Sequence, residues 1–325
     1  MIVDFDLGHL RTLVEFERRG SMQAVAAATG YSKSAVSAQL AALQREAGVV
    51  LLEPAGRRVR LTAAGTRLVE HARSILAAAD AARLDLTAQA PIAGRLRVAA
   101  YASALADDVL AVTRALHETH PALEIHLEER EPDETFALLL DGEIDLGFTY
   151  DYTLAPRAPR PGIETRVLCH TPICLAVPAG LSGLPMRVRD PEELRALAGR
   201  GWVLNSRGHD DDELVARVAA RAGFEPEIRH RADAFEVVLR LVAADLGVAL
   251  VPATTPALPG VRLIELGELS GARRMAAATR SGQAGWAPVA LMARLVGQRA
   301  GRAPTQRTGQ MSDVGNPPTL TTMPA

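Results

Sequence analysis

The sequence predicts an α/β protein with an N-terminal, all-α helix-turn-helix unit and a long helix that follows it. Three observations support this. The first 65 residues contain short helical patterns and one hairpin, residues from Thr62 to about Ala90 keep helical spacing, and strands alternate with helices after residue 94. A chain of 325 residues is long enough for at least two compact units.

Composition limits the classes of protein that fit. Hydrophobic residues make up 48% of the chain and charged residues 23%, which is typical of a soluble globular protein. The net charge of −2 provides no overall basic field, so any binding of nucleic acid must come from a local patch. No apolar run approaches the ~20 residues of a membrane span, and the acidic, polar N-terminus does not resemble a secretory signal. We expect a cytoplasmic protein that has no membrane partner.

The first helices are marked by their caps. Apolar residues recur at helical spacing from Leu7 to Val14, and Gly20 ends that run. Ser21 is placed to cap a second helix, which Gly30 terminates, and Ser32 is placed to cap a third. Two helices joined by three residues that include a glycine indicate a helix-turn-helix.

The third helix has two different sides. Val36, Leu40 and Leu43 share one side at helical spacing. The opposite side is small and polar: Ser34, Ser37, Ala38, Ala41 and Arg45. Lys33, the only lysine among 36 basic residues, lies at the edge of this side in the first turn. Two explanations stay open: an ordinary solvated face with one lysine left by coding bias, or a helix that reads the major groove.

A basic hairpin follows the third helix. The stretch "LLEPAGRRVRLTAAG" predicts a strand, a turn at residues 54–56, a tip at Arg57 and Arg58, and a second strand through Val59 and Leu61. A basic hairpin directly after a helix-turn-helix is a wing, placed to contact phosphates or the minor groove.

The long helix carries a heptad pattern in steps of four and three residues. Its members are Leu68, Ala72, Ile75, Ala79, Ala82 and Leu86. This spacing favours pairing with the same helix of a second copy, which would place two reading helices on adjacent half-sites. A helix that buries one face within its own chain is the alternative.

The rest of the chain reads as an α/β domain and a tail. Strand and helix patterns alternate from residue 94, and ligands of such folds bind at the carboxyl ends of the strands. Cys169 and Cys174 lie in "CHTPIC", which reads as two strand pieces around a turn and matches no common zinc spacing. We expect no metal and no cofactor. Residues 300–325 lack periodicity and predict a disordered tail.

The N-terminal stretch resembles the LysR-type transcriptional regulators. The residues that carry the resemblance are Gly20, Ser21, Ser32, Ala35, Val36, Ser37, Gln39, Leu43, Glu46, Gly48, Leu51 and the wing "GRRVRLTAAG". "GRLRV", "LLDGEIDLGF", "LAVPAGL" and "LVAADLGVALVP" resemble landmarks of the family's effector domain. The chain departs from the family's pattern at three positions. Lys33 stands where the family often has glutamine, Ala38 where it often has a basic or polar residue, and Pro54 where it often has arginine.

The resemblance implies a domain plan. Residues 1–65 form a winged helix-turn-helix, residues 66–90 a dimerising linker helix, and residues 94–299 a two-lobed effector domain like the periplasmic binding proteins. Lobe 1 is expected at about 94–165 and 265–299, and lobe 2 at about 166–264.

The resemblance also implies site residues. The expected DNA-binding residues are Ser21, Ser32, Lys33, Ser34, Ser37, Ala38, Gln39, Arg57 and Arg58. The expected effector-binding residues are Ser103, Thr149, Tyr150, Ser206, Arg207, His209 and Phe235. Free N–H groups at helix starts favour an anionic effector, although three aspartates at residues 210–212 are placed to satisfy one such start. Ordinary helix capping is the alternative role for these polar residues.

The expected function is that of a DNA-binding transcriptional regulator controlled by a small-molecule effector. The expected partners are promoter DNA, the effector, further copies in a homodimer or homotetramer and, as an open alternative, RNA polymerase. An enzyme is disfavoured, because G-x-S-x-G and G-x-G-x-x-G are absent and the sole lysine lies in the reading helix. A sensory or solute-binding module without regulatory activity is the second alternative, which residues 30–65 disfavour.

Overall fold

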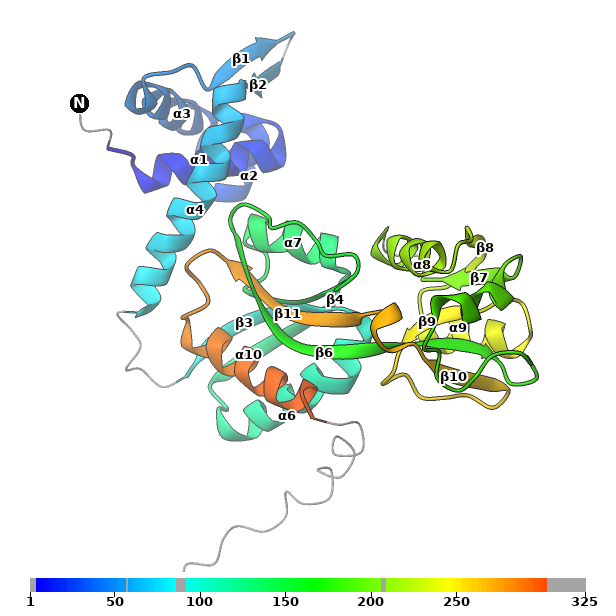
Figure 1. The fold of residues 1–325 in the computed structure, drawn as a ribbon. Coiled ribbons are helices and arrows are strands. Elements are labelled where there is room, and N and C mark those ends of the chain that lie inside the picture. Colours follow the sequence, from blue (N-terminus) through cyan, green and yellow to red (C-terminus); the bar gives the residue numbers. More distant parts are fainter. Residues whose placement is uncertain (1–3, 57, 86–91, 206–208, 303–325) are drawn as a thin grey trace, which may run out of the picture. The chain divides into compact units, whose positions relative to one another are not determined.

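The computed structural model describes residues 4–56, 58–85, 92–205 and 209–302 (Figure 1). The chain divides into two compact units. The first comprises Met1–Thr149, Ala158–Arg166 and Ala277–Ala293, and the second comprises Tyr150–Arg157, Val167–Ala276 and Arg294–Ala325. None of the described helices combines the length and apolar character that a membrane span requires.

Three short helices open the N-terminal domain: α1 (Leu7–Arg19), α2 (Met22–Thr29) and α3 (Lys33–Ala47). Helices α1 and α2 end at Gly20 (φ 70°) and Gly30 (φ 75°), a conformation that glycine adopts without strain. Ser21 and Ser32 cap α2 and α3, and each side chain accepts a hydrogen bond from the backbone N–H three residues later. The predicted helix boundaries are confirmed.

The wing is a hairpin of β1 (Leu52–Ala55) and β2 (Arg58–Leu61). It differs from the predicted turn at residues 54–56, because Pro54 and Ala55 lie inside β1, opposite Val59 and Arg58. Each strand of this hairpin has one neighbour only, so a proline can stand where its missing N–H faces away from the ladder. Helix α4 (Ala63–Asp85) follows. A Cβ at Gly65 would lie 2.2 Å from the Leu51 carbonyl oxygen, so the helix starts against the hairpin only because glycine stands there.

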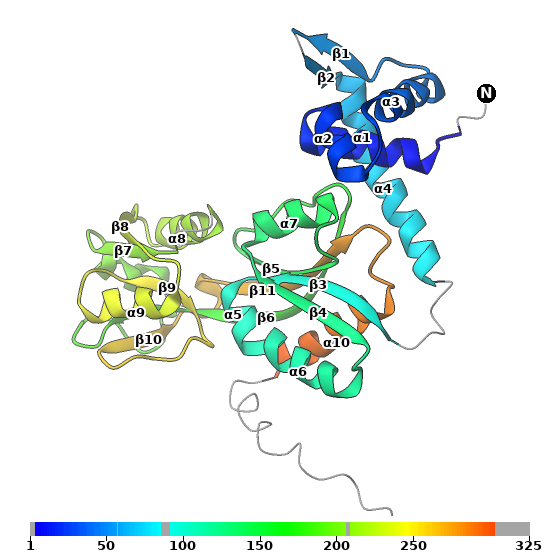
Figure 2. The same ribbon diagram turned by 180° about the vertical axis from the view of Figure 1, so that it is seen from behind.

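The first unit also contains a parallel β-α layer. Its strands are β3 (Gly94–Ala100), β4 (Leu123–Glu129) and β5 (Leu146–Tyr152), and β3 pairs in parallel with both others. Its helices are α5 (Ala102–Ala104), a π-helical turn (Leu105–Val109), α6 (Leu110–Thr119) and α7 (Pro132–Asp141). Figures 1 and 2 show α7 on one face of this layer and α6 with α10 on the other.

The remaining elements form the second unit and the segment by which the chain passes back into the first unit. The strands are β6 (Ile163–Pro178), β7 (Gly201–Leu204), β8 (Glu227–Arg231), β9 (Ala249–Pro252), β10 (Val261–Glu265) and β11 (Ala272–Arg280). The helices are a 3-10 helix (Pro191–Leu197), α8 (His209–Arg221), α9 (Phe235–Ala243), a second 3-10 helix (Gly267–Leu269) and α10 (Ala287–Ala300). The strand order is β10-β6-β11-β5-β3-β4, with β9 also paired to β6, and β7 pairs with β8.

Four expectations need correction. "CHTPIC" lies within one continuous strand, β6, rather than in two pieces around a turn. The sequence of residues 190–198 predicts an α-helix, but Pro191–Leu197 form a 3-10 helix. The sequence also predicts a helix from Ser103 to about residue 120, but it begins at Ala102 and contains a π-helical turn. Residues 265–276, expected in the first lobe, belong to the second unit. Most of the predicted tail, residues 303–325, lies outside the described residues.

Candidate nucleic-acid interface and ligand pocket

The exposed face of α3 matches the predicted reading face. Val36, Leu40 and Leu43 are at most 1% exposed and pack into the core of the N-terminal domain. The residues of the opposite side are all exposed: Lys33, Ser34, Ser37, Ala38, Ala41 and Arg45. Small residues on this side let the helix backbone come close to a base edge. This side of α3 is therefore exposed and made mostly of small side chains, and Lys33 is its long cation in the first turn.

Two of the predicted serines are engaged in the helix start. The Ser32 hydroxyl accepts a hydrogen bond from the Ala35 N–H at 3.1 Å and lies 2.9 Å from the Ser34 hydroxyl. The Ser21 hydroxyl likewise accepts from Ala24 N–H at 3.2 Å. These contacts fix the backbone N–H groups at the starts of α2 and α3. A hydroxyl also donates, so a cap of this kind still has a proton available for a phosphate oxygen.

Gln39, predicted to bind DNA, is only partly exposed, and its side chain faces inward. The Thr12 hydroxyl of α1 donates to the Gln39 Oε1 atom at 2.5 Å. Gln44, which the sequence analysis did not single out, accepts from the Leu51 and Leu52 N–H groups at 2.9 and 3.0 Å. These two glutamines tie α3 to α1 and to the wing, so they set the position of the reading face.

The wing presents two described arginines. Arg58 is exposed, and Arg60 pairs with Glu53 on the opposite strand at 2.8 Å. Arg57, the other predicted wing residue, lies outside the described residues. Tyr31, which precedes the Ser32 cap, is 52% exposed and was not among the predicted residues.

The heptad residues of α4 do not share one environment. Ala72 is fully buried in the core of the N-terminal domain, and Leu68 packs against that core. Ala72 is therefore covered within one chain, as in the alternative of a helix that buries one face, whereas Leu68 stays partly exposed. Ile75 is 37% exposed, and Ala79 is partly exposed. Leu86 and the side chain of Ala82 lie outside the described residues.

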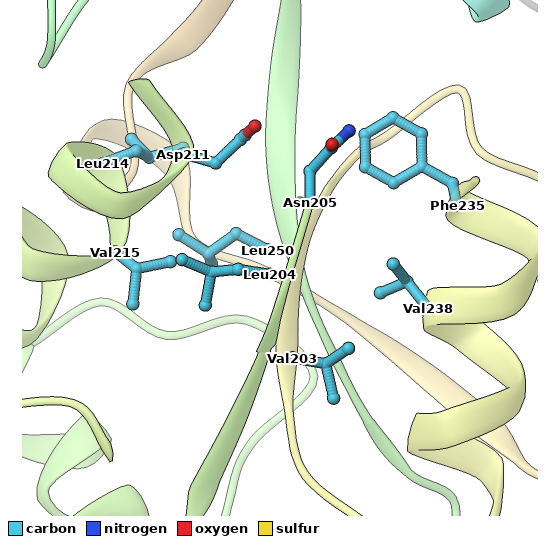
Figure 3. Close-up of a pocket in the computed structure, with 9 residues that line it drawn as sticks. All are labelled: Val203, Leu204, Asn205, Asp211, Leu214, Val215, Phe235, Val238 and Leu250. Carbon is cyan, nitrogen blue, oxygen red and sulfur yellow. The ribbon is translucent and has the colours of Figure 1, made fainter. Parts of the chain in front are cut away.

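A pocket lies in the second unit at the carboxyl end of β7 (Figure 3). Its free volume is about 10 Å³, room for about one water molecule. Most of its lining is apolar: Val203, Leu204, Leu214, Val215, Val238 and Leu250. Phe235, the first residue of α9, is the predicted effector-binding residue that the pocket contains. Asn205 and Asp211 supply its polar groups, and Figure 3 shows both side chains directed toward the same side of the pocket as the Phe235 ring.

The first turn of α8 carries three aspartates with separate partners. Asp211 Oδ1 accepts the Tyr152 hydroxyl at 2.5 Å, Asp210 pairs with Arg157 at 2.5 Å, and Asp212 pairs with Arg231 at 2.7 Å. Burial, followed by the charge of Asp211, raises the pKa of Tyr152. The phenol is thus a hydrogen-bond donor at neutral pH.

The other predicted effector residues are distributed over both units. Ser103 is the second residue of α5, directly after β3, and belongs to the first unit. Thr149 and Tyr150 lie inside β5 rather than after it, and they are 3% and 6% exposed. The Tyr150 ring lies 5.9 Å from that of Tyr152, and the Arg273 guanidinium lies 5.7 Å from its centre. Ser206, Arg207 and the side chain of His209 lie outside the described residues.

Comparison with known proteins identifies the two domains. Residues 7–66 match the bacterial regulatory helix-turn-helix proteins of the lysR family, and residues 89–301 match the LysR substrate binding domain. The chain is 30% identical over 289 residues to a probable hydrogen peroxide-inducible genes activator of Streptomyces viridosporus, covering 86% of this chain and 89% of that protein. It is 31% identical over 270 residues to the HTH-type transcriptional regulator TfdS of Cupriavidus pinatubonensis, covering 80% and 88%.

Solved structures agree on the fold. A full-length OxyR variant from Pseudomonas aeruginosa superposes with a TM-score of 0.64 at 20% identity, covering 90% of this chain and 95% of that one. Full-length CbnR in complex with its target DNA gives a TM-score of 0.50 at 24% identity, covering 90% and 100%. With both domain models matched in order, the chain belongs to the LysR family of transcriptional regulators, which bind promoter DNA through the helix-turn-helix and a small-molecule effector through the second domain.

Proposed function

We propose that the exposed face of α3 enters the major groove and that Lys33 contacts a base edge or phosphate there. The proposal rests on the difference in exposure and side-chain size between the two sides of α3. Its inner residues are at most 1% exposed, while its outer side consists of small side chains with one lysine in the first turn. Arg58 of the wing supplies a phosphate contact beside the groove.

The regulator acts as a homodimer or homotetramer in the cytoplasm, with RNA polymerase as a further contact at the promoter. A single helix-turn-helix covers one half-site, so two copies are needed to read a paired site. Among the described heptad positions, Ile75 is exposed and Leu68 and Ala79 are partly exposed, whereas Ala72 is buried. Contact between two copies through this part of α4 is the arrangement that the exposure favours.

The effector binds in the pocket between α8 and α9, near Asn205, Asp211 and Phe235. An apolar lining with a few polar groups is typical of a small-molecule site, but the free space of about 10 Å³ admits only a water-sized group, so a larger effector binds here only if the lining side chains move. An effector changes DNA binding only by the difference of its affinities for the two states of the protein.

A dithiol sensor is not supported, although relatives are named as peroxide-inducible activators. Cys169 and Cys174 lie five residues apart on the continuous strand β6. At ~3.3 Å per residue their Cα atoms are about 16 Å apart, whereas a disulfide requires less than about 7 Å. We therefore propose control by ligand binding rather than by a disulfide within the chain.

The test uses DNA from beside the gene of this protein. Binding of the full chain to labelled fragments is followed by fluorescence anisotropy at several salt concentrations, with scrambled fragments as the control. A specific regulator binds one fragment about 10³-fold or more tighter than scrambled DNA, and its affinity falls steeply with salt. Equal and weak binding to all fragments would support the sensory module without regulatory activity.

A further inference from the structure

A depression on the second unit, open to solvent, has far more free space than the pocket near Phe235. Its free volume is about 370 Å³, within the range of roughly 300–1,000 Å³ that is typical of ligand sites. It is lined by Leu154 and by Arg217, Ala220 and Arg221 of α8, and we call it the α8 depression. Among the described residues, the depression and the pocket share helix α8 but no lining side chain.

Two arginines, one turn apart on α8, line the α8 depression. Arg217 donates from Nε to the Glu213 Oε1 atom at 3.0 Å, and its Nη2 atom contacts the same oxygen. Arg221 donates from Nη1 to the carbonyls of Glu268 and Leu269 at 2.9 and 3.0 Å. A guanidinium has five N–H donors. Toward the described residues each arginine thus uses two donors, which hold it in place, and keeps three.

The charge balance at the depression favours an anion. Arg217 and Arg221 contribute two positive charges, and Glu213 contributes one negative charge. The carbonyl end of α8 adds about half a negative charge, so roughly half a positive charge remains, which suits a monoanion better than a dianion. Two guanidinium groups with spare donors match the planar carboxylate. Because both arginines are exposed, dissolved salt weakens this attraction.

The remaining wall of the depression is apolar and fixed in position. Leu154 is partly buried and lies in a turn in which the Ala155 N–H donates to the Tyr152 carbonyl at 3.0 Å. The neighbouring Thr153 exchanges two hydrogen bonds with Ala272, both at 2.9 Å: its N–H donates to the carbonyl, and its hydroxyl oxygen accepts the N–H. The leucine side chain therefore offers a held apolar surface on which a ring or alkyl group can pack.

We propose that the α8 depression is a second ligand site, for a small carboxylate that carries an apolar group. The carboxylate binds Arg217 and Arg221, and the apolar group packs on Leu154 and Ala220. A bare anion uses only the arginines, and a neutral ring uses only the apolar wall, so a ligand that joins both features binds best. The site goes beyond the proposed effector pocket near Phe235 and does not depend on it.

Calorimetry on the full chain at low salt compares four probes: benzoate, benzamide, acetate and inorganic phosphate. Benzoate has both features, benzamide lacks the charge, acetate lacks the ring, and phosphate lacks the ring and carries more charge. We expect benzoate to bind at least about tenfold tighter than benzamide, because hydrogen bonds to a charged group are the stronger ones. Acetate and phosphate should bind more weakly than benzoate, and added salt should weaken benzoate binding.

Two variants locate the binding. Arg217→Gln should weaken benzoate about tenfold. Its matched control is Arg240→Gln, because Arg240 is an exposed arginine that pairs with Glu236 four residues earlier on α9, as Arg217 pairs with Glu213 on α8. Ala220→Phe fills the depression without removing a charge and should abolish benzoate binding. Ala220 is exposed, so the larger side chain leaves the core unchanged, which circular dichroism checks.

Equal benzoate affinity in the wild type and in Ala220→Phe overturns the inference, because benzoate then binds elsewhere on the chain. The inference also fails if benzamide, acetate or phosphate binds as tightly as benzoate, or if none of the four probes binds. Equal weakening by Arg217→Gln and Arg240→Gln would show a general effect of charge rather than a site. Specific binding of DNA is measured separately, so any of these results leaves the proposed function standing.

Discussion

Replacing Lys33 by Ala tests the reading helix with little risk to the fold. Lys33 is exposed and is the first residue of α3, whose start is capped by Ser32. Alanine and lysine have similar helix propensities, and removing a cation from the positive end of the helix dipole stabilises by about 0.3–1 kcal/mol. The variant should therefore be as stable as the wild type or slightly more so, and lost DNA binding cannot be ascribed to unfolding.

The expected loss of binding follows from the number of half-sites. A base contact contributes about 1–3 kcal/mol, so two copies on a paired site lose about 2–6 kcal/mol, or roughly 30-fold at the least. This loss should vanish on scrambled DNA. If Lys33 meets only phosphate, affinity falls equally on all sequences, and the slope of log affinity against log salt shrinks by ~0.9 for each lost contact.

Fluorescence anisotropy on specific and scrambled fragments at four salt concentrations distinguishes these cases. Arg45→Ala is the matched control, since it removes a cation from the exposed side of α3 in its last turn. If Lys33→Ala binds every fragment with wild-type affinity and salt slope, the reasoning is refuted. Lys33 then belongs to an ordinary solvated helix face.

Four further outcomes are expected. Arg58→Gln should reduce the salt slope by ~0.9 per copy with little change in sequence preference, measured in the same titrations. Ile75→Glu should weaken association between copies in light scattering while circular dichroism stays native, because its side chain is 37% exposed within one chain. Thr12→Val leaves the Gln39 carbonyl without its donor and should lower the free energy of unfolding by about 1–3 kcal/mol in urea titrations. Iodoacetamide should modify Cys169 before Cys174, because burial raises the pKa of the Cys174 thiol and lowers its thiolate fraction, and mass spectrometry should find no bond between the two.

The N-terminal domain could be predicted closely because its signals are local. Gly20 and Gly30 end helices by their positive φ, and Ser21 and Ser32 begin them by capping N–H groups three residues away. Each of these effects acts within a few residues of sequence. The side of α3 that faces outward follows from the same helical period.

Strand β6 shows where local signals fail. Pro172 suggested a turn in "CHTPIC", but the strand continues through it. The Pro172 carbonyl accepts the N–H of Ala253, which lies far along the chain. The proline's missing N–H therefore does not prevent the residue from joining the ladder through its carbonyl oxygen. Local propensity favours a turn here, and pairing with a distant segment decides the outcome.

The same distinction explains why only part of the ligand pocket could be predicted. Phe235 could be placed at the mouth because it starts a helix after a strand, a position that sequence order reveals. The aspartates of α8 look like a local cap in the sequence, yet Asp211 accepts a phenol from residue 152 and lines the pocket. The partner of a carboxylate at a helix start is thus set by a pairing between two distant segments, which local sequence does not reveal.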